Sequence, residues 1–250
     1  MIPFLRTLFF FVVFWLHQIL ILPLLLLFLF LTRGGRAPRH RHAVRVISLT
    51  WGHMIRALGG VRLDVQDRSG LPADETVLFV SNHQGDFDIP CLLSTAGRPT
   101  AFVAKKELAH IPLVSQWMRV MGCIFLDRQN RRKQVEQIRQ TVDHLQGGIS
   151  MVVFPEGTRS QGPGMGEFAK GSLQIGLRAG VPIVPVTLRD TYTLYPKGKT
   201  LFPGGDAAVI FHPAIRPEDL SDEEKNTLQE RVQAQIQAGL DEEKSTNVEH

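Results

Sequence analysis

Hydrophobic positions are distributed very unevenly along this chain. Residues 8–31 are almost wholly apolar and are interrupted only by His17, Gln18 and Pro23. As a helix, this run would reach about 36 Å at about 1.5 Å per residue, enough to cross a hydrocarbon core about 30 Å thick. It is too long for the core of a signal peptide, and no small-x-small cleavage site follows it. The pattern predicts an N-terminal membrane anchor, either one spanning helix or a broken helix that returns to the same leaflet.

Beyond the anchor, short apolar runs alternate with segments of helical periodicity. Residues 44–58 have an amphipathic pattern that ends at Gly59 and Gly60, and residues 61–65 alternate as a half-buried strand. Further strands are predicted at residues 77–80, 100–104, 123–126, 150–154, 181–188 and 207–211. A short helix is predicted to begin at Pro90, and longer helices are predicted over residues 112–121 and 132–145. Another helix is predicted to end at Leu177, and the last one begins after a capping box formed by Ser221 and Glu224. This alternation predicts an α/β domain with a mixed, largely parallel sheet flanked by helices.

Two prolines mark the predicted strand at residues 181–188. Pro182 and Pro185 lack the backbone N–H that a sheet ladder uses, and proline in sheets is confined largely to edge strands and bulges. We therefore expect this strand at an edge of the sheet or at a bulge rather than in its centre.

The placement of charge orients the anchor. The net charge is only +4, but Arg33, Arg36, Arg39, Arg41 and Arg45 follow the apolar run, whereas only Arg6 precedes it. This excess predicts a cytoplasmic location for the downstream part, with the arginines against anionic head groups. No aromatic residues interleave with them, so we expect a bilayer and not a nucleic acid as the partner. We divide the chain into an anchor with a basic juxtamembrane helix (residues 1–58) and an α/β domain (residues 59–250).

Several classes of site are missing from the sequence. The two cysteines, Cys91 and Cys123, form no CxxC pair, so we expect no disulfide and no metal site, and both thiols packed as small apolar groups. There is no GxSxG elbow for a serine nucleophile and no GxxxxGK[ST] loop for a nucleotide.

Polar, ionisable residues follow four of the predicted strands. They lie at residues 83–88, 105–106, 127–128 and 156–159. If the strands are mostly parallel, these ends meet at one edge of the sheet, where open α/β sheets place their sites. Together they supply a base, carboxylates and several cations. That set suits a phosphorylated substrate whose hydroxyl must lose a proton, because arginine binds phosphate oxygens in pairs.

The first of these strand ends carries the candidate base. His83 is followed by Asp86 and Asp88, and Gly85 permits a turn that brings a carboxylate back to the imidazole. Such a carboxylate would fix the tautomer and stabilise the imidazolium. The spacing leaves Asp86 and Asp88 nearly equal as the partner. A helix N-cap formed by either aspartate explains the same residues without any chemistry.

Four sequence blocks follow one another between residues 77 and 188. They are NHQGDFD at residues 82–88, GCIFLDR at 122–128, FPEGTRS at 154–160 and VPIVPV at 181–186. In these blocks the chain resembles the membrane glycerolipid acyltransferases, most closely the 1-acylglycerol-3-phosphate (lysophosphatidate) acyltransferases. The apolar N-terminal segment is also similar to that of the family.

The resemblance implies transfer of a fatty acyl group from a thioester, acyl-CoA or acyl carrier protein, to the free hydroxyl of lysophosphatidate, with no cofactor. It makes His83 the catalytic base and Asp88 its partner, and it leaves Asp86 as a helix cap or a bystander. It also assigns five residues to the acceptor's glycerol phosphate: Arg128, Glu156, Gly157, Thr158 and Arg159. Lys105 joins them only because it ends a predicted strand. Another lysophospholipid, glycerol 3-phosphate or an amino-acid lipid is an alternative acceptor, and a lipid hydrolase or a non-catalytic lipid-binding protein is an alternative function.

Overall fold

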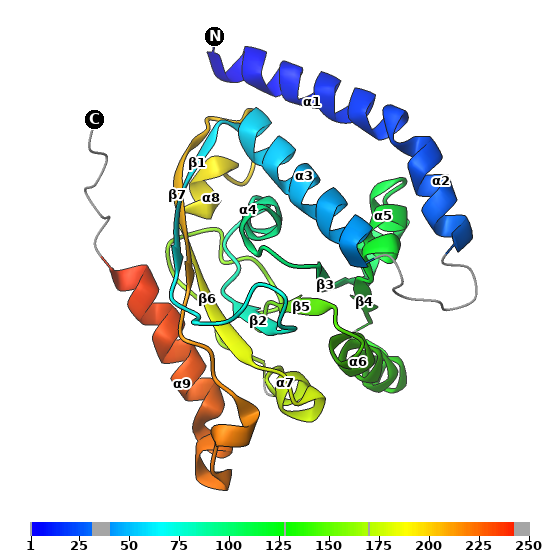
Figure 1. The fold of residues 1–250 in the computed structure, drawn as a ribbon. Helices are drawn as coiled ribbons and strands as arrows, with labels where there is room; N and C mark the ends of the chain where they lie inside the picture. The colour runs from blue at the N-terminus through cyan, green and yellow to red at the C-terminus, as the bar shows by residue number, and fades with distance from the viewer. Residues whose placement is uncertain (1, 32–40, 128, 170, 243–250) are drawn as a thin grey trace.

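A computed structural model describes residues 2–31, 41–127, 129–169 and 171–242. Across these residues runs a seven-stranded sheet of order β1-β7-β6-β2-β5-β3-β4 (Figure 1). Its strands are β1 (Val61–Asp67), β2 (Leu78–Ser81), β3 (Thr100–Lys105), β4 (Ile124–Leu126), β5 (Ser150–Val153), β6 (Ile183–Arg189) and β7 (Gly205–Phe211). All neighbouring strands run parallel except β6 and β7, which are antiparallel. The predicted α/β fold with a mixed, largely parallel sheet is confirmed.

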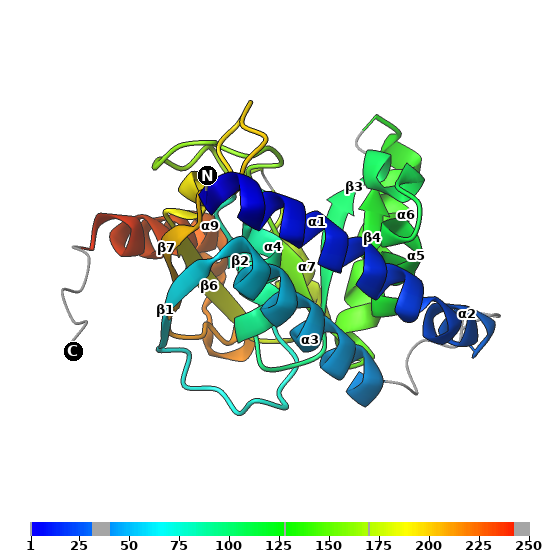
Figure 2. The ribbon, with the colours of Figure 1, turned by 90° about the horizontal axis from the view of Figure 1, so that it is seen from above.

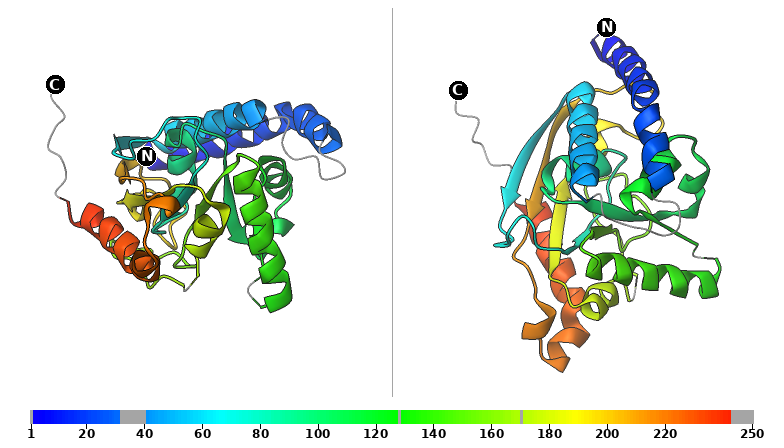
Figure 3. Two further views of the ribbon diagram at one scale, coloured as in Figure 1. Left: turned by 60° about the horizontal axis from the view of Figure 1, so that its bottom comes forward. Right: turned by 45° about the vertical axis from the view of Figure 1, so that its right-hand side comes forward.

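Helices cover both faces of this sheet (Figures 1 and 3). One face carries α3 (Arg41–Gly59), α4 (Asp88–Thr95) and α5 (Val114–Met121), and the other carries α6 (Arg131–Gln146), α7 (Gln174–Ala179) and α9 (Asp222–Asp241). The short helices η1 (Lys106–His110), α8 (Thr191–Leu194) and η2 (Pro217–Asp219) follow β3, β6 and β7. The sequence did not predict η1 or α8. The chain moves toward one edge of the sheet through β2, β3 and β4 and then returns through β5 and β6. Because such crossovers are right-handed, the helices of the outward path (α4, α5) and those of the return path (α6, α7) lie on opposite faces.

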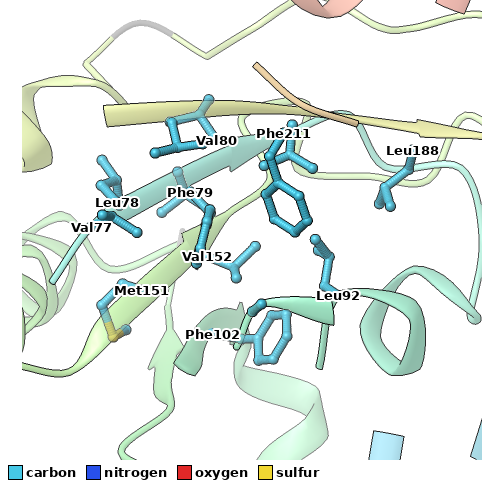
Figure 4. Close-up of a cluster of buried hydrophobic side chains, with 14 of the residues drawn as sticks. Val77, Leu78, Phe79, Val80, Leu92, Phe102, Met151, Val152, Leu188 and Phe211 are labelled. Atoms are coloured by element: carbon cyan, nitrogen blue, oxygen red, sulfur yellow. The ribbon is translucent and has the colours of Figure 1, made fainter. Parts of the chain in front are cut away.

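The core lies around the central strands β2 and β5, which are buried along their whole length. Because helices cover both faces, these strands are continuous apolar runs instead of alternating ones. Figure 4 shows Phe79 and Val152 packed between Phe211, Leu92 and Phe102. Complete burial of one such large side chain contributes about 1.5–3 kcal/mol to stability.

Strand β6 lies inside the sheet, between β7 and β2, and all of its residues are buried. Of the two predicted alternatives, the edge position was therefore wrong, and the bulge is the one that the structure shows. Val186 pairs with Phe211 in the antiparallel ladder. Ile183, three residues before Val186, forms a bridge with Ile215, which is four residues after Phe211. The segment after β7 therefore accommodates one extra residue there, as in a bulge. Pro185 pairs with Val80 of β2, but on the side of β7 it falls in this irregular stretch, before the regular ladder that begins at Val186.

The apolar N-terminal segment forms two helices, α1 (Ile2–Leu20) and α2 (Leu22–Leu31). Pro23 lies in the first turn of α2, where its missing N–H is tolerated, and its ring prevents α1 from continuing. Among the described residues, one helical stretch, Pro3–Leu20, is long and apolar enough to cross a membrane. Helix α2 has 10 residues and so reaches only about 15 Å.

Helix α1 packs against the α/β domain along one side and lies across it in Figure 2. Arg6 donates a hydrogen bond to the Pro203 carbonyl, Thr7 Oγ1 accepts one from Phe202 N at 2.8 Å, and the Phe10 and Phe202 rings are 4.5 Å apart. Its other side exposes large apolar residues: Phe4, Leu5, Leu8, Phe9, Val12, Trp15, Leu16, Ile19 and Leu20. Exposed apolar area on this scale is typical of a surface that meets a membrane or a partner. The division at residue 58 stays a prediction, and Arg33, Arg36 and Arg39 lie outside the described residues.

Candidate active site

The carboxyl ends of β2, β5, β3 and β4 lie next to one another at one edge of the sheet. Strand β5 is followed by α7 on one face, whereas its neighbours β2 and β3 are followed by α4 and α5 on the other face. Chain segments that leave neighbouring strands in opposite directions open a crevice at the strand ends. His83 follows β2, Arg159 follows β5 and Lys105 ends β3, so the predicted convergence of these polar ends is confirmed.

The structure pairs His83 with Asp88. Asp88 is the first residue of α4, its side chain is 0% exposed, and its Oδ2 lies 2.5 Å from His83 Nδ1. The same oxygen accepts hydrogen bonds from the backbone N–H groups of Gln84 (2.7 Å) and Gly85 (3.0 Å). At Gly85 a Cβ atom would lie 3.2 Å from the Thr191 carbonyl oxygen, so this tight turn favours glycine. The imidazole is held by Nδ1, and its Nε2 is left for other partners.

Thr191 completes the surroundings of this carboxylate, and no motif in the sequence marks it. Its buried hydroxyl donates a hydrogen bond to Asp88 Oδ1, and its backbone N–H donates to Gln84 Oε1 at 3.2 Å. It comes from α8, just after β6. Asn82 fixes the same junction, because its side-chain amide exchanges hydrogen bonds of 2.7 and 2.8 Å with the backbone of Leu188. The carboxylate is thereby held on both oxygens.

Glu156 lies behind His83 and does not line the cavity that opens beside the imidazole. Its Oε1 accepts a hydrogen bond from the His83 backbone N–H at 2.7 Å, and its Oε2 accepts one from Gly166 at 2.8 Å. Burial raises the pKa of Glu156, although these two N–H groups act in the opposite direction. Both carboxylate oxygens are used by the backbone, so the side chain braces the loop that carries the imidazole. The structure does not bring it to the place predicted for an acceptor contact.

The other residues predicted to contact the acceptor lie in different places relative to this cavity. Gly157 lines the cavity and adopts a left-handed φ of 71°, which glycine accommodates without strain. Thr158 is exposed and does not line this cavity. Arg128 lies outside the described residues. Lys105 is exposed at the cavity wall and forms no ion pair with a residue that the structure describes.

A cavity of about 420 Å³ opens beside His83, and we call it the main cavity. The Phe154 ring in its wall stacks on the imidazole with 4.1 Å between ring centroids. Its charged wall residues are the cations Lys105 and Arg159 and the carboxylates Asp86 and Glu107. Its apolar wall residues are Ile89, Phe102, Val103, Ala104, Leu108, Leu126 and Phe154. The cavity therefore places an imidazole and charged side chains of both signs next to an apolar wall.

Asp86 pairs with Arg159 across the rim of this cavity. The N-cap residue of α4 is Phe87, which forms no side-chain cap, so the prediction of Asp86 as a helix cap was wrong. That Asp86 is a bystander in catalysis stays a prediction. Asp88 enters the first turn of the helix with its carboxylate turned back toward His83, and Asp86 points instead to the loop after β5. The Arg159 guanidinium thus already has one carboxylate partner.

Neither cysteine is available as a nucleophile. Cys91 and Cys123 are buried and unpaired, as predicted, and burial raises the pKa of the Cys123 thiol to about 12. Burial also raises the pKa of Cys91 strongly. Among the residues that the structure describes, no three His, Cys, Asp or Glu side chains gather closely enough to hold a metal ion. The absence of a metal or cofactor stays a prediction.

The chain is similar to known proteins in sequence and in fold. A family model described as Acyltransferase matches residues 62–189. The 1-acyl-sn-glycerol-3-phosphate acyltransferase BAT2, chloroplastic, of Brassica napus is 36% identical over 176 residues, which cover 68% of this chain and 51% of that protein. The 1-acyl-sn-glycerol-3-phosphate acyltransferase of Borreliella burgdorferi is 31% identical over 179 residues and 72% of each chain. The chain spans about half the length of the chloroplast relatives that it matches.

A solved structure shares the whole fold. The crystal structure of the 1-acyl-sn-glycerophosphate acyltransferase PlsC from Thermotoga maritima superposes with a TM-score of 0.79 at 30% sequence identity. The match covers 95% of this chain and 94% of that chain. The similarity therefore includes the N-terminal helices as well as the sheet.

Proposed function

The chain belongs to the acyltransferase family, and on that premise we propose that it transfers a fatty acyl group from an acyl thioester to the free hydroxyl of 1-acylglycerol 3-phosphate, giving phosphatidate. The relatives named above are named for activity on this acceptor. The observation that carries the proposal is the His83–Asp88 pair, which opens on a largely apolar cavity with cations at its wall. Acyl-CoA or acyl carrier protein serves as the donor, and no cofactor takes part.

His83 acts as the general base. Because Asp88 engages Nδ1, Nε2 accepts the proton of the acceptor hydroxyl as the oxygen attacks the thioester carbonyl carbon. Asp88 stabilises the imidazolium that forms. When the tetrahedral intermediate collapses, the C–S bond breaks and the leaving sulfur takes the proton from His83, so a free thiol departs. The acceptor is itself the nucleophile, which fits a site whose described cysteines are buried.

Lys105 and Arg159 bind the acceptor's phosphate. Both line the main cavity together with His83. In lysophosphatidate only a short stretch of the glycerol backbone separates the phosphate from the free hydroxyl. A phosphate bound by cations in the same cavity therefore brings that hydroxyl to the imidazole, and such positioning supplies a large part of the barrier reduction.

The bilayer supplies the acceptor. Helix α1 exposes an apolar side, and it is bonded to the domain through Arg6 and Thr7. An anchor fixed in this way holds the site close to the lipid surface, with the α/β domain on the cytoplasmic side according to the arginine excess after residue 32.

The test is an acceptor panel with purified full-length protein in detergent micelles. Labelled acyl-CoA is offered with lysophosphatidate, other lysophospholipids, glycerol 3-phosphate and an amino-acid lipid. We expect labelled phosphatidate from lysophosphatidate at the highest kcat/KM. No product from lysophosphatidate would refute the proposal, and labelled free fatty acid without any acceptor would indicate a hydrolase.

Two variants separate catalysis from lipid binding. His83→Ala should lower kcat at least about a thousandfold, in line with removal of a catalytic-triad member. His110→Ala, which alters an exposed histidine on η1, is the matched control and should keep the wild-type rate. Equal rates in the two variants would refute the role of His83 as the base, and a wild type that binds lysophosphatidate without any turnover would favour a lipid-binding protein.

A further inference from the structure

A second cavity, of about 280 Å³, lies beside the main cavity. The two share Gly85, Asp86 and Arg159 as lining residues, so the Asp86–Arg159 ion pair separates them. His83 lines the main cavity and is not part of the second one. The second cavity is thus next to the reaction centre without containing it.

The wall of the second cavity carries donors suited to an anion. The chain has two tyrosines, and both of them, Tyr192 and Tyr195, line this cavity, as do Lys197 and Lys199. Neither lysine forms an ion pair with a described residue. Among the described lining residues the one carboxylate is Asp86, which Arg159 already neutralises. Ammonium and phenol groups together supply several hydrogen bonds to phosphate oxygens and little competition for them.

The segment that bears these lysines is fixed in place. The Tyr195 ring lies 4.8 Å from the Phe202 ring, which is buried against α1. Between the two lysines, Gly198 adopts a φ of 76°, and the N–H of Lys199 donates to the Pro196 carbonyl at 3.1 Å. The cations therefore stand on a hydrogen-bonded turn whose far end is packed into the core.

We propose that the second cavity binds the phosphate groups of the acyl donor, that is, of the phosphopantetheine carrier on which the thioester is built. This rests on the function proposed above, in which two phosphorylated substrates meet at His83. The acceptor's phosphate is close to its reacting hydroxyl, so its cations must share a cavity with the imidazole, as Lys105 does. The donor's phosphates are separated from the thioester by the long pantetheine arm, so their cations must lie outside that cavity, as Lys197 and Lys199 do.

The test compares Lys197→Gln/Lys199→Gln with the wild type for two kinetic constants. We expect KM for acyl-CoA to rise about tenfold, which corresponds to about 1.4 kcal/mol, while KM for lysophosphatidate changes less than about twofold. Lys105→Gln should show the opposite split. The matched control, Lys133→Gln/Lys225→Gln, removes the same charge from α6 and α9 and should leave both constants at their wild-type values.

Truncated donors locate the anion. Acyl-N-acetylcysteamine has no phosphate, so its KM should already be high in the wild type. The Lys197→Gln/Lys199→Gln substitution should then raise the KM for this donor little further, because both changes remove the same interaction. An effect on acyl-CoA alone identifies the nucleotide phosphates as the ligand. An effect that extends to acyl 4′-phosphopantetheine identifies the phosphate that coenzyme A shares with carrier protein. Both results support the proposal.

Direct binding separates this proposal from the function on which it rests. Coenzyme A is titrated calorimetrically into the wild type and the Lys197/Lys199 variant in the same micelles, with an expected tenfold loss of affinity. Equal affinity, an unchanged donor KM or an equal rise in acceptor KM overturns the proposal. If the wild type binds coenzyme A through these lysines but transfers no acyl group, the proposed function is refuted and the proposed binding site still holds.

Discussion

Replacing Thr191 by valine tests how the carboxylate of Asp88 is positioned. The substitution removes one buried hydroxyl and nearly preserves the shape of the side chain. Asp88 Oδ2 keeps its contact with His83 and the N–H groups of Gln84 and Gly85. Oδ1 loses the Thr191 hydroxyl, the one donor found for it among the described residues.

The expected cost follows from the type of hydrogen bond that is lost. A hydrogen bond to a charged group is worth about 1.5–3 kcal/mol, and the oxygen left behind is buried and unpaired. We therefore expect the free energy of unfolding to fall by about 1.5–3 kcal/mol. A carboxylate that turns to find another donor no longer aligns Oδ2 with the imidazole. At tenfold per about 1.4 kcal/mol, kcat should fall roughly 10- to 100-fold, with KM for both substrates nearly unchanged.

The assay measures kcat, both KM values and the melting temperature of each variant. Thr193→Val on the same short helix is the matched control, because its hydroxyl donates only to the Asp190 carbonyl, at 2.7 Å. Thr191→Ser restores the hydroxyl and should return kcat to within about threefold of wild type. A Thr191→Val protein with lowered stability and wild-type kcat would refute the positioning role. Equal effects of the two valine substitutions would do the same.

Three further predictions concern the His83–Asp88 pair, Glu156 and the packing of Gly176 in the core. Asp88→Asn should lower kcat about 10³- to 10⁴-fold in steady-state assays, because the amide cannot stabilise the imidazolium, and retained turnover would contradict the assignment. Burial raises the pKa of Glu156, so the folded chain holds that proton more firmly than the unfolded chain, and stability falls as pH rises from about 4.5 through the raised pKa. Glu156→Gln should lose this part of the pH dependence of the melting temperature. The same change of melting temperature with pH in the variant and the wild type would contradict this prediction. In Gly176→Ala the new Cβ would lie 2.6 Å from Ile183 Cγ1, so unfolding measurements should show a loss of about 1–3 kcal/mol, whereas Gly162→Ala, with open space around it, should show almost none.

The sequence by itself determined the elements and the edge of the sheet that carries the site. Apolar periodicity is a local property, so the strands and the long helices were found within a few residues of their observed bounds. The capping box at Ser221 and Glu224 is present as predicted. His83, Lys105 and Arg159 were found because polar residues that end parallel strands must meet at one edge.

Tertiary structure alone decided how these side chains are used. The placement of β6 depends on the strands that flank it, so its prolines pointed to the wrong position. Glu156 and Asp86 lie next to the site in sequence, but their partners, His83 N–H and Arg159, come from segments 73 residues away. Thr191 is 103 residues from the carboxylate that it binds. Hydrogen bonds form within a few tenths of an ångström, and only the packed fold fixes which distant groups come that close.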